Sequence, residues 1–129
     1  MGLTLFEAAK IAMKNAHAPY SKFQVGAAIL TKSGSVFSGC NVENASYPEG
    51  WCAETSAIAQ MVSAGETSIA EILVLADQKP KITPCGGCRQ RIAEFADQTT
   101  LVHLCDHDGV VETVTIGQLL PAQFELESS

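Results

Sequence analysis

Two short stretches, Cys52-Ala53-Glu54 and Pro84-Cys85-Gly86-Gly87-Cys88, decide the fold and the chemistry of this chain. Together they supply three thiols that can bind a metal and one carboxylate that can carry protons. Three protein ligands leave a tetrahedral Zn²⁺ with one open position, which is typical of catalytic rather than structural zinc sites. The two stretches therefore predict a metal-dependent enzyme.

The same residues admit other interpretations. Cys52 can be a buried core cysteine, and Cys85 with Cys88 can form a redox dithiol, because a CxxC pair alone is a weak signal. Iron can also occupy a site with three soft ligands and an open position. A non-catalytic, zinc-stabilised binding module would need a fourth protein ligand, and the sequence offers no well-placed candidate.

The composition predicts one globular domain over residues 1–129. Of the 129 residues, 47% are hydrophobic and 17% are charged, so the chain can fold around a sizeable core. This apolar fraction is high for a small domain and favours subunit contacts in an oligomer. The five cysteines, an odd number, fit metal binding or catalysis in the cytoplasm better than a set of disulfides.

The charge balance argues against several kinds of partner. Eight Lys and Arg against fourteen Asp and Glu give a net charge of −6. A nucleic-acid-binding protein needs a basic surface, which this balance does not supply. No segment has the pattern of a secretory signal or a membrane span. We therefore expect a cytoplasmic protein with a small uncharged substrate, and no nucleic-acid or membrane partner.

The hydrophobic periodicity predicts an α/β fold. Helices are expected from Thr4 to Ala16, from Cys52 to Ala64, from Thr83-Pro84 onward with the proline at the first helical position, and from Thr115 to just before Pro121. The first and last of these open on capping boxes, Thr4-Leu5-Phe6-Glu7 and Thr115-Ile116-Gly117-Gln118. Strands are expected at Phe23–Thr31, Val36–Val42, Glu71–Ala76, Thr100–Cys105 and Val110–Thr115. This order of elements predicts a three-layer α/β/α arrangement with a five-stranded mixed sheet.

The spacing of the cysteines predicts how two of these helices begin. Cys85 and Cys88 are three residues apart, so their sulfur atoms lie on one face of a helix. Cys52 and Glu54 are two apart and would not face each other inside a helix, so Cys52 is expected at or before the N-cap. The positive ends of the helix dipoles would then lower the thiol pKa values.

From Pro19 to Arg91 the sequence resembles the small cytidine deaminases that act on free nucleosides. Leu119-Leu120-Pro121 followed by Phe124 also resembles the C-terminal end of that family, so the resemblance covers essentially the whole chain. It implies a cytidine deaminase-like fold with one Zn²⁺ per subunit, held by Cys52, Cys85 and Cys88. The matching stretches are Ala18-Pro19-Tyr20-Ser21-Lys22-Phe23, Val25-Gly26-Ala27-Ala28, Asn41-Val42-Glu43-Asn44-Ala45-Ser46-Tyr47, Cys52-Ala53-Glu54 and Pro84-Cys85-Gly86-Gly87-Cys88-Arg89-Gln90.

The resemblance implies deamination of cytidine and 2′-deoxycytidine to uridine and 2′-deoxyuridine, with release of ammonia, as in pyrimidine salvage. Bound zinc would lower the pKa of a water molecule. Glu54 would take a proton from the attacking water, deliver it to N3 of the cytosine ring, and then transfer a proton to the leaving amine. The alternative role for Glu54 is an interaction with the helix dipole alone.

The nucleoside-binding residues of the family carry over position by position. Asn41 and Glu43 match its ribose-binding pair, and Phe23 matches the residue that stacks on the pyrimidine. The backbone near Ala53 and Cys85 is expected to contact the base edge. Without the resemblance, Asn41 and Glu43 would be solvated loop residues and Phe23 a core residue.

Three further positions imply an assembly. Ala45, Tyr47 and Phe124 match positions that approach the pocket of a neighbouring subunit in tetrameric family members. The resemblance therefore implies a homotetramer whose active sites are completed by neighbouring subunits. For Tyr47 and Phe124, ordinary interface packing is the alternative.

One position departs from the family pattern. The family commonly has Arg directly after Cys-Ala-Glu, where it hydrogen-bonds the zinc cysteines and offsets their charge, but this chain has Thr55. A hydroxyl can donate to a sulfur atom but brings no positive charge. Arg89, which follows Cys88, is the group expected to compensate.

Related activities fit this sequence less well. Deaminases of deoxycytidylate or tRNA typically use His as the first ligand and need cationic phosphate contacts, whereas this chain has Cys52 and an acidic balance. A blasticidin-S-type deaminase shares the Cys-Ala-Glu and Pro-Cys signature. The ribose-binding stretch from Asn41 to Tyr47 favours a cytidine deaminase instead.

Overall fold

The computed structural model describes residues 4–77 and 82–126. These residues contain a five-stranded mixed sheet with the strand order β2-β1-β3-β4-β5. β3 and β4 run parallel, and the other neighbouring strands pair antiparallel. The strands are β1 (Val25–Thr31), β2 (Val36–Cys40), β3 (Ile69–Ala76), β4 (Leu101–Asp106) and β5 (Gly109–Thr115).

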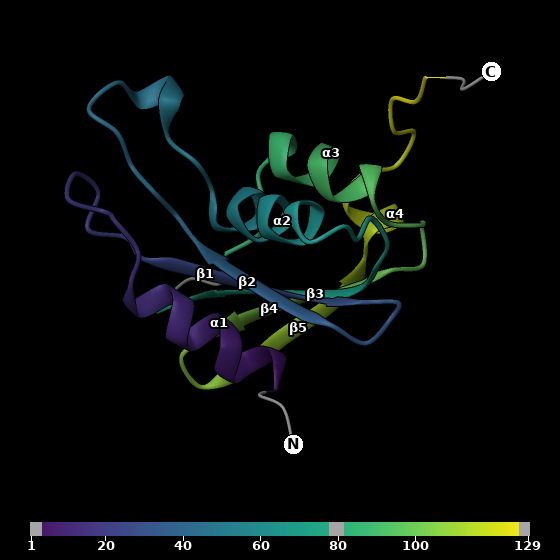
Figure 1. The fold of residues 1–129 in the computed structure, drawn as a ribbon, viewed down its shortest axis with the longest axis horizontal. Helices are drawn as coiled ribbons and strands as arrows, with labels where there is room; N and C mark the ends of the chain where they lie inside the picture. Colours follow the sequence, from purple (N-terminus) through teal and green to yellow (C-terminus); the bar gives the residue numbers. More distant parts are fainter. Residues whose placement is uncertain (1–3, 78–81, 127–129) are drawn as a thin grey trace.

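Helices cover both faces of this sheet (Figure 1). α1 (Leu5–Lys14) lies on one face, and α2 (Ala53–Ser63) and α3 (Gly86–Glu94) lie on the other. A 3₁₀ helix, η1 (Tyr47–Glu49), precedes α2, and the short α4 (Ile116–Leu119) follows β5. The predicted three-layer α/β/α arrangement is confirmed. Each helix in the described ranges is too short or too polar to traverse a bilayer.

Apolar side chains fill the space on each side of the sheet. The larger cluster lies between the sheet and the pair α2 and α3, and includes the fully buried Ile29, Met61 and Ile72. The smaller cluster joins α1 to the opposite face through Leu73 and Leu75. β3 contributes to both clusters, which explains why its sequence is an almost continuous apolar run.

Both predicted capping boxes are present. The hydroxyl of Thr4 accepts the N–H of Glu7 at 3.1 Å, and the Glu7 carboxylate accepts the N–H of Thr4 at 3.1 Å. Thr115 and Gln118 make the same reciprocal pair at the start of α4, at 3.1 and 2.8 Å. These local bonds satisfy N–H groups that the first helical turn leaves unpaired.

The start of α3 differs from the prediction. Thr83-Pro84 was expected to open this helix, with the proline at the first helical position, but α3 begins at Gly86 and Cys85 is its N-cap. Cys85 has an extended backbone, with φ −69° and ψ 170°. The proline therefore belongs to the approach to the helix, and the cysteine takes the capping position.

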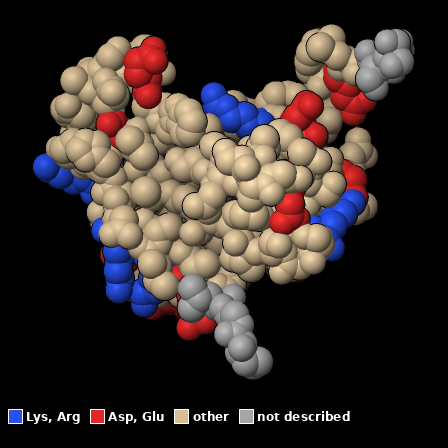
Figure 2. All heavy atoms as spheres, viewed as in Figure 1, with Lys and Arg blue, Asp and Glu red and all other residues tan. Residues whose placement is uncertain are grey.

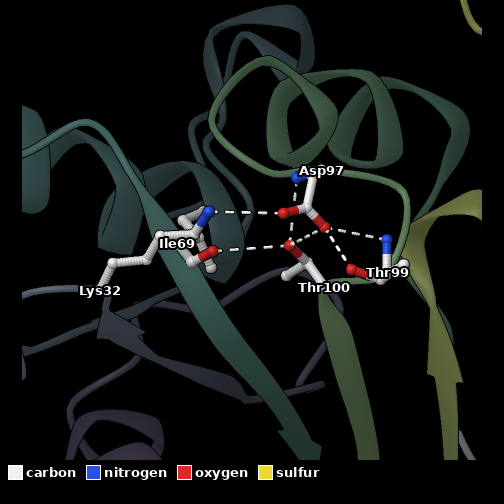
Figure 3. A network of polar contacts seen from close by, with 5 residues as sticks. All are labelled: Lys32, Ile69, Asp97, Thr99 and Thr100. Atoms are coloured by element: carbon white, nitrogen blue, oxygen red, sulfur yellow. Dashed lines mark hydrogen bonds and ion pairs between the residues drawn. The ribbon is translucent and has the colours of Figure 1, made fainter.

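A polar network fixes the connection between α3 and β4 (Figure 3). The carboxylate of Asp97 accepts the N–H and the hydroxyl of Thr99, at 2.9 and 2.6 Å. Lys32 Nζ lies 3.3 Å from its other oxygen, and the Thr100 hydroxyl links Asp97 to the Ile69 carbonyl. These contacts, chiefly the hydrogen bond from the Thr99 hydroxyl, lower the pKa of Asp97 to about 2.

Asp97→Asn is expected to destabilise the protein at neutral pH, because a lowered pKa means that the folded state favours the ionised carboxylate. This stabilisation is present above the unfolded pKa of about 3.9 and is lost as the pH falls through about 2. Urea unfolding should show the wild type and the variant converging between these values. Glu94→Gln removes the same charge from an exposed position of α3 and is the control. A loss of unfolding free energy in Asp97→Asn that does not change with pH would contradict this account.

Candidate active site

The three predicted metal ligands meet where α2 and α3 begin. Cys52 is the N-cap of α2, Cys85 is the N-cap of α3, and Cys88 lies in the first turn of α3. Their sulfur atoms all lie within 4.8 Å of one another. Cys88 is buried, Cys52 is half-buried and Cys85 is exposed. The predicted N-cap position of Cys52 is confirmed.

This donor set fits Zn²⁺. Zinc–thiolate bonds of about 2.3 Å in a tetrahedral site place the sulfur atoms about 3.8 Å apart, so the cluster needs little rearrangement to hold one ion. Both N-cap cysteines have extended backbones, with ψ of 158° at Cys52 and 170° at Cys85. The N–H groups at the two helix starts place partial positive charge beside the thiolates.

Hydrogen bonding within the cluster favours ionisation of one thiol. The Cys88 thiol is the main cause that lowers the pKa of Cys52 to about 6, and Cys85 and the charge of Arg91 act in the same direction. Burial acts against this shift. A thiol with this pKa is largely ionised at neutral pH, as a metal ligand must be.

Glu54 is a buried acid beside the cluster. It is the second residue of α2, and the residue is 5% exposed. Burial is the main cause that raises its pKa to about 7, and the charge of Cys52 adds to the effect, while a backbone hydrogen bond opposes it. A carboxyl group with this pKa can both accept and donate a proton near neutral pH.

The cluster and Glu54 line a cavity of about 590 Å³, a volume typical of small-molecule sites. Its walls come from the segment before β1, the loop between β2 and α2, the start of α2 and the start of α3. Of the predicted substrate-binding residues, Phe23, Asn41, Glu43, Tyr47 and Ala53 line it.

Asn41 and Glu43 also hold the cavity wall together. Asn41 accepts the N–H of Val25 at 2.9 Å and donates to the carbonyl of Phe23 at 2.8 Å. Glu43 accepts both N–H groups of Tyr20-Ser21, at 3.0 and 3.1 Å, and the Ser21 hydroxyl at 2.5 Å. An amide keeps a second N–H and a carboxylate keeps further lone pairs, so both side chains retain capacity for a ligand. Sequence reasoning missed the role of Ser21.

The other two predicted contacts lie elsewhere. Ala45 is exposed in the loop before η1 and does not line the cavity. Phe124 is 70% exposed and lines a separate hollow of about 390 Å³, where its carbonyl accepts a hydrogen bond from Gln90. Tyr47 is 73% exposed, and its ring packs edge-on against Tyr20. Within one chain, therefore, the cavity brings together most of the predicted residues but not Ala45 or Phe124.

Charge compensation differs from the expectation. The Thr55 hydroxyl is buried and has no hydrogen-bond partner among the described residues, so it does not donate to a sulfur. Arg89 donates to the carbonyls of Pro84 and Leu119, at 2.8 and 2.9 Å, rather than to a zinc cysteine. Arg91, which the sequence reasoning missed, contacts the sulfur cluster instead. Its spacing of three residues from the last cysteine was the available signal.

Gly39 in β2 sets how closely α2 approaches the sheet. A Cβ atom there would lie 2.4 Å from the amide nitrogen of Ala57 and 2.7 Å from the Cβ of Ser56. The Ser56 hydroxyl also donates to the carbonyl of Cys40 at 2.8 Å. These contacts fix the first turns of α2, and with them the positions of Cys52 and Glu54.

Gly39→Ala should reduce the free energy of unfolding by about 1–3 kcal/mol, as overpacking does, and should also weaken zinc binding by displacing the start of α2. Gly26→Ala is the matched control, because a Cβ there would lie 2.1 Å from the Ala9 carbonyl oxygen of α1, which carries no predicted site residue. Urea unfolding and chelator competition measure the two effects. Equal losses of zinc affinity in both variants would show that α2 packing has no particular role.

An α/β/α fold that gathers three cysteines and a buried acid at the starts of two helices defines the class of zinc-dependent deaminases. A family model described as "Cytidine and deoxycytidylate deaminase zinc-binding region" matches residues 3–104. The chain belongs to this family.

Individual relatives agree with this assignment. The chain is 42% identical to a cytidine deaminase of Sporosarcina psychrophila, over 95% of this chain and 90% of the relative. It is 45% identical to a cytidine deaminase of Halalkalibacterium halodurans, over 90% of this chain and 88% of the relative. The crystal structure of cytidine deaminase from Burkholderia pseudomallei superposes with a TM-score of 0.88 at 46% identity, covering 93% of this chain and 96% of the other.

Proposed function

We propose that this protein is a zinc-dependent cytidine deaminase that hydrolyses cytidine and 2′-deoxycytidine to uridine and 2′-deoxyuridine, with release of ammonia. The observation that carries the proposal is the cluster of Cys52, Cys85 and Cys88 beside the buried Glu54 in one cavity. Relatives named cytidine deaminase, at 42–45% identity over most of the chain, support it.

When bound, zinc supplies a Lewis acid that lowers the pKa of a coordinated water. Glu54 then carries the protons. It accepts one from the attacking water and delivers it to N3 of the cytosine ring as the oxygen adds to C4. It then takes the second proton from the new C4 hydroxyl and transfers it to the leaving amino group. The C4–N4 bond breaks, ammonia leaves and the uracil ring remains. A single acid with a pKa near neutrality can perform both transfers.

The cavity walls suit a nucleoside. Phe23 offers a ring for the pyrimidine to stack on, and Asn41 and Glu43 have spare hydrogen-bonding capacity for ribose hydroxyls. Ala53 and Cys85 line the cavity, which supports the proposal that their backbone contacts the base edge. On the face shown in Figure 2, Lys and Arg form separate groups among acidic residues rather than a basic band. This favours an uncharged nucleoside over a nucleotide or a nucleic acid.

We further propose a homotetramer in which neighbouring chains complete each active site, and the exposed aromatic residues support such an association. Tyr47, Trp51 and Phe124 are 73%, 52% and 70% exposed, and large apolar side chains at this exposure are typical of association surfaces. Ala45 and Phe124 would then contact the cavity of a neighbouring chain. All five cysteines are free thiols, which suits the reducing cytoplasm and a role in pyrimidine salvage there.

Glu54→Gln should lower the deamination rate by about 10²–10⁴-fold, because the amide cannot carry protons between water and substrate. Loss of cytidine ultraviolet absorbance measures the rate, and zinc content should stay at the wild-type value. Glu94→Gln, the exposed control on α3, should remain active. Full activity in Glu54→Gln would overturn the proton-transfer role, and an inactive zinc-loaded wild type would overturn the function itself.

Light scattering should give a mass of four times the 13.6 kDa chain. A mixture of Glu54→Gln and Phe124→Ala chains should then regain activity after subunit exchange, because some sites would pair an intact Glu54 with an intact Phe124 from the neighbouring chain. Each variant alone, taken through the same exchange, is the control. Mixed oligomers with no more activity than their parents would show that Phe124 does not act across the interface.

A further inference from the structure

The sulfur cluster needs a positive group. Three thiolates around one zinc dication carry one net negative charge, and Glu54 beside them adds another when ionised. Cys88 and Glu54 are both buried, so water solvates this charge poorly. A cation close to the sulfur atoms would therefore stabilise the metal-bound cluster.

The two residues that the sequence analysis considered beside the zinc cysteines, Thr55 and Arg89, do not supply this cation. Thr55, at the position where the family commonly has Arg, carries no charge, and its hydroxyl has no hydrogen-bond partner in the described part of the chain. The Arg89 guanidinium donates to two main-chain carbonyls, one of them at Leu119, and thereby ties α3 to α4. Neither residue brings a cation to a sulfur.

Arg91 does bring one. Its Nη1 atom lies 4.0 Å from Sγ of Cys88, the buried ligand. The two residues are three apart in α3, and long helical side chains lean toward the helix N-terminus, so the guanidinium reaches back over the first turn. The guanidinium lies beside Gly87, where an added Cβ would be 3.5 Å from Nη1, an ordinary van der Waals distance.

We propose that Arg91 is a positioning residue of the metal centre, which places a positive charge beside Cys88 when zinc is bound and offsets the negative charge that Thr55 leaves uncompensated. The proposal rests on the zinc site of the proposed function and adds a residue to it. The guanidinium acts from α3 on the last cysteine. Because Arg91 is exposed, solvent and salt screen its effect more than they would screen a buried cation.

The test measures zinc affinity by chelator competition rather than activity. Arg91→Gln should weaken zinc binding by about tenfold at low salt, the lower end of the range for residues that support metal ligands. Arg91→Lys, which keeps the charge, should recover most of this loss. Lys10→Gln, which removes a cation from α1 on the opposite face of the sheet, should bind zinc as the wild type does.

Salt dependence separates a charge effect from a packing effect. The gap between wild type and Arg91→Gln should shrink from about 0.01 M to about 1 M ionic strength, where the screening length falls from about 30 Å to about 3 Å. In urea unfolding without metal, the wild type and Arg91→Gln should have the same free energy of unfolding. The proposal is overturned if Arg91→Gln binds zinc within about twofold of wild type at low salt, or if Arg91→Lys binds zinc as weakly as Arg91→Gln. It is also overturned if the difference in zinc affinity between wild type and Arg91→Gln does not change with ionic strength. A wild type that binds no zinc would overturn the metal site as well.

Discussion

The meeting of two helix N-termini on one face of the sheet is the constraint on which the site depends. The three sulfur atoms come within 4.8 Å because α2 and α3 begin side by side and each is capped by a cysteine. The parallel pairing of β3 with β4 requires a crossover connection, and α3 supplies it. The close contact of α2 with β2 at Gly39 fixes the other helix. Moving either helix would separate Cys52 from the CxxC pair.

The cavity wall is built from the residues that are proposed to bind substrate. Asn41 bridges the backbone on both sides of the start of β1, and Glu43 gathers Tyr20-Ser21 through three hydrogen bonds. Each side chain is therefore held in place before a ligand arrives, which lowers the cost of ordering it on binding. The same bonds lower the pKa of Glu43, chiefly through the Ser21 hydroxyl, and keep it an acceptor.

Local signals in the sequence predicted much of this arrangement. The capping boxes at Thr4 and Thr115, and the N-cap position of Cys52, depend on neighbours within a few residues, so spacing alone identified them. The start of α3 was placed too early, because the preference of proline for the first helical position gives way here to Cys85, which takes the N-cap and leaves Pro84 one residue before it. The hydrogen bonds of Asn41 and Glu43 join distant segments and have no signature in the chain.

The error over charge compensation has a geometric cause. Arg89 is next to Cys88 in sequence, but adjacent residues on a helix point in directions about 100° apart, and its guanidinium reaches Leu119 instead. Residues three apart share a face, which brings Arg91 to the sulfur. A helix that starts with two zinc cysteines therefore offers its next turn, rather than its next residue, as the place for a compensating cation. The proposed role of Arg91 in α3 therefore explains how this chain can carry Thr55 where the family commonly has an arginine in α2.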